Sequence, residues 1–205
     1  MPSVLVNDLW LARSIRLKRE KTDESRYDEV WDGVYVVPPS RDHSHQRFVA
    51  VFGFIIHEVL DWNAGDAIYP GINVTDRVKG WKKNYRIPDV AVVLRDNPNR
   101  KFDAAIRGGP DFLVEVLSKN DRALEKLDFY ASVGVREVLI LDRNPWGLAL
   151  YRLDNGRLDL AGRSALGDGD PVVSAVLPLN FRLVEGETRV RVEVRHNQSG
   201  QTWLA

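Results

Sequence analysis

The sequence predicts a mixed α/β (α+β) domain in which helices flank a central sheet. Valine-rich apolar runs at 89–94, 112–117 and 137–142 are typical of short strands that are buried on both faces. Two longer segments, 43–62 and 121–133, repeat apolar residues three and four positions apart, as one face of a helix does. The order of these segments along the chain indicates helices packed on a mixed sheet.

A β-hairpin is predicted near the N-terminus. Residues 27–31 and 34–37 are rich in valine and aromatic side chains and flank Asp32 and Gly33. An Asp-Gly pair favours a two-residue turn because both turn positions need positive φ. Two prolines, Pro38 and Pro39, end this element.

The first helix follows the hairpin directly. Ser40 or Asp42 can cap its N-terminus, and it is expected to run to about Trp62. Its buried face is predicted from residues at helical spacing, namely Phe48, Val51, Phe52, Ile55, Ile56 and Val59.

A strand over 67–74 and a polar, basic stretch over 75–86 come next. The second helix is expected to begin at Asn120 or Asp121 and to end at about Val133, before Gly134. Its predicted inward residues are Leu124, Leu127 and Ala131.

The C-terminal part is predicted to be β-rich. Turn signals at 154–156 and 167–171 separate short apolar runs, and the polar residues 196–205 are expected to fray. No repeat or low-complexity linker interrupts the chain. We therefore expect residues 1–205 to form a single domain, with 154–205 as a β-rich C-terminal extension.

Composition narrows the chemistry. The chain has no cysteine, which excludes thiolate metal sites, disulfides and cysteine nucleophiles and suits the cytoplasm. The longest apolar stretch, 48–56, is too short to span a membrane, so no membrane partner is expected.

Basic residues gather in two places although the formal net charge is zero. Residues 77–107 contain nine Lys or Arg against three acids, which are Asp89, Asp96 and Asp103. A second cluster lies within 13–21. Such runs are usually solvated loops, but the first one surrounds Asp89.

Asp89 and Glu115 are the strongest candidates for chemistry. Asp89 opens one predicted buried strand, and Glu115 lies inside the next one. A buried carboxylate costs several kcal/mol unless it is paired, hydrogen-bonded or bound to a metal. If the two strands are neighbours, both carboxylates can bind one Mg²⁺ or Mn²⁺. The simpler alternative is a structural ion pair of Glu115 with Arg86 or Arg136.

Several motifs in this order resemble the Uma-two family of bacterial endonucleases, which belongs to the PD-(D/E)XK phosphodiesterase superfamily. They are Pro88-Asp89-Val90-Ala91-Val92-Val93, Phe112-Leu113-Val114-Glu115-Val116-Leu117-Ser118, Lys126 with Tyr130, and the segment 134–142. The 27–33 hairpin and the His45-Gln46 pair are also similar. The likeness covers about residues 25–153 and implies a restriction-endonuclease-like core.

The resemblance implies that Asp89 and Glu115 bind the metal and that both act in catalysis with a lysine. Leu117 stands where the superfamily has its lysine, two residues after Glu115. In the family that this sequence resembles, the lysine lies on the following helix, so Lys126 is the match and Lys119 is the rival. Arg122, Lys126 and Tyr130 share one helix face at four-residue spacing.

Accessory residues are expected around this centre. His45, or His43 beside it, could orient water or bind phosphate, but a surface or capping role is an equal alternative. Glu29 could add an acid. Nucleic-acid backbone contacts are expected from Lys79, Lys82, Lys83 and Arg86.

The expected function is therefore a Mg²⁺- or Mn²⁺-dependent endonuclease acting on nucleic acid, with DNA as the substrate. A homodimer is expected, because cutting a duplex needs two sites and two-fold pairs are the commonest assembly. The resemblance favours it too, and the segment after 154 offers strand edges for pairing. The alternative is a nuclease-like module that binds nucleic acid or a protein without cutting.

Overall fold

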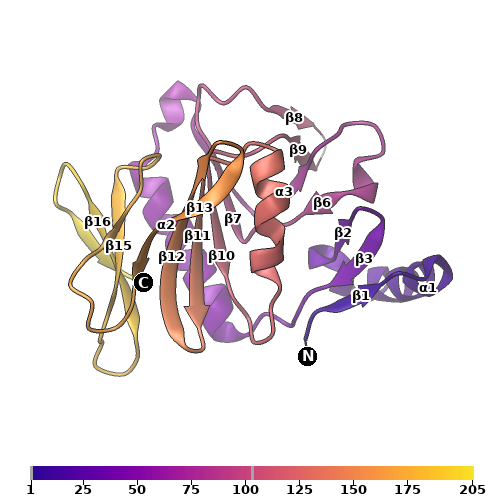
Figure 1. Ribbon diagram of the computed structural model, residues 1–205, viewed down its shortest axis with the longest axis horizontal. Coiled ribbons are helices and arrows are strands. Elements are labelled where there is room, and N and C mark those ends of the chain that lie inside the picture. The colour runs from indigo at the N-terminus through magenta and orange to yellow at the C-terminus, as the bar shows by residue number, and fades with distance from the viewer. Residues whose placement is uncertain (1, 103) are drawn as a thin grey trace.

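A six-stranded sheet forms the centre of the computed structural model, which describes residues 2–102 and 104–205 (Figure 1). In spatial order its strands are β13 (Arg157–Ser164), β12 (Trp146–Asp154), β11 (Glu137–Arg143), β10 (Phe112–Val116), β7 (Val90–Val93) and β4 (Ala67–Pro70). Only β10 and β11 run parallel. The three predicted valine-rich strands are thus neighbours, and the mixed sheet flanked by helices is confirmed.

A second sheet of short strands lies beside the first. In order it contains β1 (Val4–Val6), β3 (Val34–Val37), β2 (Glu29–Trp31), β6 (Tyr85–Arg86), β5 (Asn73–Thr75), β9 (Ala105–Arg107) and β8 (Arg100–Phe102). The predicted hairpin is β2–β3, and Asp32 and Gly33 have the expected positive φ values of 47° and 91°. Asp103, one of the acids counted above, lies outside the described residues.

The single strand predicted over 67–74 is wrong. Gly71 has a φ of 66°, which L-residues rarely adopt, and the chain turns there. β4 therefore ends at Pro70 in the central sheet, while β5 begins at Asn73 in the second sheet. This turn joins the two sheets.

The C-terminal sheet contains β14 (Val172–Val173), β15 (Leu179–Val184), β16 (Arg191–His196) and β17 (Thr202–Leu204). Fraying of 196–205 is contradicted, because β17 pairs with β16 and Ala205 exchanges backbone hydrogen bonds with Val192. The Phe181 ring packs near those of Phe52 and Phe112, so this sheet shares the main hydrophobic core. The division into a core and an extension at about residue 154 stays a prediction.

The first predicted helix is α2 (His43–Val59). The Asp42 side chain caps it by accepting a hydrogen bond from the backbone N–H of His45 at 2.7 Å. The helix ends before the expected Trp62, because Asp61 caps a separate 3-10 turn, η2 (Trp62–Ala64). Its fully buried apolar side chains are Phe48, Phe52, Ile55 and Ile56.

The second helix differs in its first turn. It starts as a 3-10 turn, η4 (Ala123–Lys126), and continues as α3 (Leu127–Ser132). Because a 3-10 turn has three residues per turn, its buried side differs from that of an α-helix. Ala123 and Lys126 are therefore buried, and Leu124, predicted to face inward, is 53% exposed.

Neither predicted N-terminal cap is used. Asn120 has a φ of 61°, and the Asp121 carboxylate accepts backbone hydrogen bonds from Ser118 and Arg122 instead. The C-terminal prediction holds, because Gly134 has a φ of 85°.

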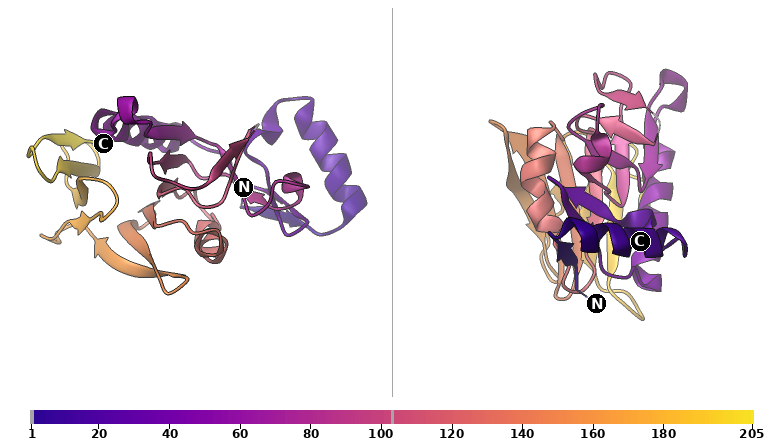
Figure 2. Two further views of the ribbon diagram at one scale, coloured as in Figure 1. Left: turned by 90° about the horizontal axis from the view of Figure 1, so that it is seen from above. Right: turned by 90° about the vertical axis from the view of Figure 1, so that its right-hand side faces the viewer.

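A helix near the N-terminus, α1 (Leu9–Glu20), was not predicted. It has no buried residue, so no apolar periodicity indicated it. It lies at the opposite end of the molecule from the C-terminal sheet (Figure 2). Two more 3-10 turns are η1 (Glu24–Tyr27) and η3 (Trp81–Lys83). Among the described residues, no helix is both long and apolar enough to cross a membrane.

Alternation along the central strands separates two cores. Val90, Val92 and Val114 pack on the side of α2, whereas Ala91 and Leu113 pack on the side of α3. The two helices cover opposite faces of the sheet (Figure 2). Because side chains alternate between faces, Asp89 and Glu115 belong to the α3 face.

Gly109 packs so closely against the backbone of residues 134 and 135 that an amino acid with a side chain does not fit there. A Cβ there would overlap the backbone of Gly134 and Val135, whereas one at Gly53 in α2 would meet nothing within 4 Å. We expect Gly109→Ala to lower the free energy of unfolding by about 3 kcal/mol and Gly53→Ala to raise it by about 0.5–1 kcal/mol. Urea unfolding of both variants measures this. Equal effects would show that the Gly109 contact relaxes freely.

Candidate functional site

Asp89, directly before β7, and Glu115, in β10, lie at the same end of two adjacent strands. The β7–β10 ladder pairs Val90 with Val114, and the next position outward brings Asp89 opposite Glu115. Opposite residues of an antiparallel pair have Cβ atoms about 5 Å apart on the same face. The two residues are 2% and 4% exposed. The sheet register therefore brings together the two carboxylates singled out in the sequence.

Lys126, in the turn before α3, contacts Glu115 of this pair and a third carboxylate, Glu29. Its Nζ lies 3.1 Å from Glu115 Oε1 and 2.9 Å from Glu29 Oε1. The residue is 8% exposed, whereas Lys119 is exposed in the loop before it. The 3-10 geometry of η4, which turned Leu124 outward, turns Lys126 inward.

Glu29 is the carboxylate that the sequence indicated least. It is 3% exposed on β2, and its oxygens accept hydrogen bonds from Trp31 Nε1 at 2.5 Å and from the Ile87 backbone N–H at 2.8 Å. The available signal was an acid inside a β-strand pattern, Asp28-Glu29-Val30-Trp31. That pattern leaves open which acid faces inward.

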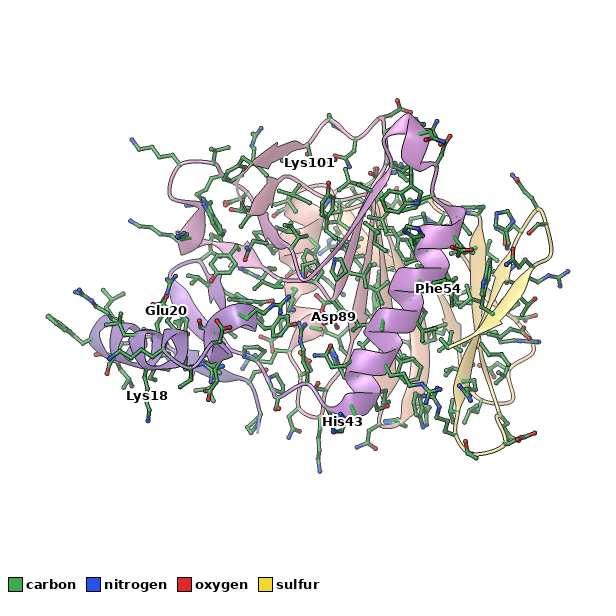
Figure 3. The ribbon with its side chains drawn as sticks, turned by 180° about the vertical axis from the view of Figure 1, so that it is seen from behind. Lys18, Glu20, His43, Phe54, Asp89 and Lys101 are labelled. Carbon is green, nitrogen blue, oxygen red and sulfur yellow. The ribbon has the colours of Figure 1, made fainter. Side chains whose placement is uncertain are left out.

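Asp89 has a different set of partners. The Val116 N–H donates to Oδ2 at 2.8 Å, and His45 Nε2 lies 3.1 Å from the same oxygen. Arg41 Nη2 lies 2.9 Å from Oδ1, yet this contact lacks hydrogen-bond geometry, and Oδ1 is left without a hydrogen-bond donor. His45 thus reaches the site. His43 lies exposed at the outer end of α2, while Asp89 lies inside the molecule (Figure 3).

The electrostatics differ between the two carboxylates. Burial raises the pKa of Glu115 to about 8; the Lys126 charge opposes this shift, and the charges of Asp89 and Glu29 add to it. Tyr130 donates a hydrogen bond to Glu115 Oε1 at 2.7 Å. For Asp89, burial also opposes ionisation, but the contacts from His45, Arg41 and the Val116 N–H outweigh it and lower the pKa.

Lys126 remains charged in this setting. Burial by itself would lower the pKa of its ammonium group, but the negative charges of Glu115 and Glu29 outweigh burial and raise that pKa. A cation thus stays fixed beside a carboxyl group whose proton is held unusually tightly. Groups with perturbed pKa values gather at functional sites more often than elsewhere.

A small cavity of about 20 Å³ adjoins these side chains, room for about one water molecule. Glu29, Arg41, Asp89, Glu115 and Lys126 all line it. Within the part of the chain that the structure describes, no group of three or more His, Cys, Asp or Glu side chains is arranged to hold a metal ion.

Two opposed carboxylates nevertheless fit a hard divalent cation. Mg²⁺ often takes one or two carboxylates and completes its shell with water or substrate oxygens. The buried Asp89 Oδ1 has no hydrogen-bond donor and can serve as a ligand atom of this kind once Arg41 Nη2, 2.9 Å away, moves aside. The donor chemistry at Asp89 and Glu115 therefore suits Mg²⁺ or Mn²⁺.

Arg86 does not lie where the sequence suggested. It was expected to contact nucleic acid, but it is 4% exposed, and its guanidinium lies over the rings of Trp31 and Phe129. Its Nη1 donates to the Val30 carbonyl at 3.0 Å. A residue enclosed in this way cannot reach a phosphate backbone. Lys79, Lys82 and Lys83 are exposed.

The structural alternative for Glu115, an ion pair with Arg86 or Arg136, does not form. Arg136 contacts Asp111 at 3.2 Å, and the partner of Glu115 is Lys126. Arg41 was not expected at the site at all, because it precedes Asp89 by 48 positions and no motif links the two.

The same fold is found in a solved structure. A protein from Anabaena variabilis, whose structure is titled a "putative nuclease belonging to DUF820", has the same fold with a TM-score of 0.57. The two share 15% sequence identity over 72% of this chain and 80% of that one.

The family model of Uma2, described as "Putative restriction endonuclease", matches residues 14–185. The chain belongs to this family, which confirms the resemblance found in the sequence. No curated protein matches the chain.

The pKa of Glu115 generates a prediction about stability. Between its ordinary value of 4.5 and about 8, the folded state holds a proton that the unfolded chain releases, so raising the pH destabilises the fold. We expect the difference in free energy of unfolding between wild type and Glu115→Gln to move against the wild type by about 1 kcal/mol per pH unit in this window. Urea unfolding at several pH values measures it. A constant difference would mean that Glu115 is ionised throughout.

Proposed function

We propose that this protein is a metal-dependent endonuclease that hydrolyses phosphodiester bonds of nucleic acid, with DNA as the substrate. The observation that carries the proposal is the contact of Lys126 Nζ with Glu115 at 3.1 Å, on the sheet face that also holds Asp89. Two carboxylates and a lysine in one buried cluster are suited to phosphoryl chemistry, which needs negative charge to be bound and neutralised.

The family and the fold support a nuclease. The family description names restriction endonucleases, and the solved structure of the same fold is titled a nuclease. Exposed Lys79, Lys82 and Lys83, around η3, are suited to contact phosphates without reading sequence. DNA as the substrate and the choice of Mg²⁺ or Mn²⁺ are parts of the proposal.

Each residue of the cluster has a distinct proposed task. The chemistry supplied by a divalent cation at Asp89 and Glu115 would be Lewis-acid polarisation of the scissile phosphate. Lys126 would neutralise charge that develops on the phosphoryl oxygens. Glu29, at 2.9 Å, holds the ammonium group of Lys126 in place, and Tyr130 holds Glu115. His45 orients Asp89 from the start of α2.

One observation favours the alternative of a binding module that does not cut. The cavity beside the carboxylates has room for about one water molecule, so a phosphodiester enters only if side chains move. A cleavage assay with added Mg²⁺ or Mn²⁺ separates the two functions, because a binding module would retain nucleic acid intact under the same conditions.

Lys126→Met tests the proposed role of the lysine and keeps most of the side-chain volume. We expect it to lower the turnover of DNA cleavage by about 100- to 1000-fold, the usual effect of losing one electrostatic contact to a transition state. Lys119→Met, in the exposed loop, should change turnover by less than about threefold. A plasmid-nicking assay measures both. The reverse ranking would assign the function to Lys119.

The fold of the Lys126 variant needs its own control, because removing one partner of a buried ion pair can cost about 3–5 kcal/mol. The double variant Glu29→Gln/Lys126→Met removes one charge of each sign and should have a higher free energy of unfolding than Lys126→Met. Both lysine variants should retain Mn²⁺-induced thermal stabilisation, whereas Glu115→Gln should lose it. Stabilisation that survives in Glu115→Gln would exclude Glu115 as a ligand.

We also propose a homodimer, since two sites are needed to cut both strands of a duplex. β17 is an edge strand of the C-terminal sheet and is available for pairing. Light scattering at micromolar concentration should give twice the chain mass of 23.3 kDa. A monomer mass would favour nicking or single-strand cleavage.

A further inference from the structure

Arg41 lies between the enclosed site and a larger groove. The groove has a volume of about 520 Å³ and shares four lining residues with the small cavity, which are Tyr27, Pro38, Pro39 and Arg41. Clefts of this size are typical of ligand sites. Arg41 is therefore the charged residue among the four that line both the groove and the cavity beside Asp89.

The guanidinium of Arg41 is positioned by the Tyr27 ring and by Asp89. Its side chain is 13% exposed, and its Cζ lies 3.7 Å from the centroid of the Tyr27 ring. Within the described residues, no hydrogen bond from the Arg41 side chain is found, although Asp89 Oδ1 is 2.9 Å away. Apart from Nη2, which contacts Asp89, its N–H donors thus remain available for a ligand.

Two neighbouring arginines show the contrast. Arg19, which also lines the groove, donates from Nε and Nη2 to Asp28 at 2.8 and 3.0 Å. Arg143 donates to the Leu117 carbonyl and to Asp42 at 3.1 and 2.8 Å. These two side chains tie the fold together, whereas the Arg41 guanidinium lies over the Tyr27 ring and has one ion-pair partner, Asp89, among the described residues.

We propose that Arg41 is a phosphate-binding residue at the entrance of the site, which exchanges its contact with Asp89 for a phosphodiester of the entering strand. This inference rests on the proposed nuclease function for the identity of the ligand. A planar guanidinium can bind two phosphate oxygens at once. The groove is also lined by Asp23 and Glu24, so the orientation of Arg41, and not the net charge of the groove, favours phosphate binding.

The binding of an oligonucleotide in the absence of metal tests the role of Arg41 separately from cleavage. The probe is a fluorescein-labelled single-stranded oligonucleotide in EDTA, measured by anisotropy at several salt concentrations. Arg41→Gln should weaken binding by about tenfold, as expected for a charged hydrogen bond, and reduce the slope of log K against log salt by about 0.7. Arg26→Gln is the matched control, since Arg26 is exposed beside the same Tyr27 ring and outside the groove. It should change affinity less than about twofold.

Variants of Asp89 separate phosphate binding from a structural role. Asp89→Asn frees Arg41 from its carboxylate and should tighten metal-free binding, and adding Arg41→Gln should remove that gain. Equal affinity of Asp89→Asn and Asp89→Asn/Arg41→Gln would overturn the proposal and leave Arg41 as a counter-ion of Asp89. The double variant also keeps the test valid if Arg41→Gln alone unfolds.

Inorganic phosphate distinguishes the source of the ligand. We expect it to compete with the oligonucleotide only weakly, because it lacks the rest of the strand. Arg41-dependent binding of phosphate together with Arg41-independent binding of the oligonucleotide would overturn the assignment to nucleic acid. A wild type that cuts DNA but binds it independently of Arg41 overturns this inference alone, whereas Arg41-dependent binding without any cleavage overturns the proposed function alone.

Discussion

The ammonium group of Lys126, buried between Glu29 and Glu115, is the interaction on which the rest of the site depends. Two buried carboxylates close together repel each other and lose hydration, and a cation at 2.9 and 3.1 Å opposes both effects. The contact joins three elements, namely the N-terminal hairpin, the central sheet and the turn before α3. It therefore ties the second sheet to the first at the place where the chemistry is proposed.

The central sheet supplies the geometry around that contact. Alternation of side chains puts Asp89 and Glu115 on the face covered by α3, while Val90 and Val114 fill the core under α2. The same alternation makes Leu117 a partly buried apolar residue packed in the α3-side core. Leu117, two residues after Glu115, is thus an apolar packing residue, and the cation beside Glu115 is Lys126 from η4.

The carboxylates of the site are already paired with basic side chains. Arg41 and Lys126 each contact a carboxylate, so the cluster is electrostatically balanced before any ligand arrives. Burial raises the pKa of Glu115 despite the charge of Lys126, whereas at Asp89 the contacts from His45, Arg41 and a backbone N–H outweigh burial and lower the pKa. Because Arg41 is paired with Asp89 in the absence of a ligand, it can exchange this carboxylate for a phosphate, which is the role proposed for it.

Local sequence patterns determined several secondary-structure elements and the candidate site residues of this protein. The Asp-Gly turn, the Asp42 cap and the valine-rich strands follow from backbone preferences and apolar spacing, and the motif order indicated the family together with Asp89, Glu115 and Lys126 as candidates. Tertiary structure alone decided which side chains face the site. Glu29 and Arg41 come from segments far from Asp89 in sequence, Arg86 is buried by two aromatic rings, and one 3-10 turn reverses the exposure of Leu124 and Lys126. These outcomes depend on packing between distant segments, which local periodicity does not encode.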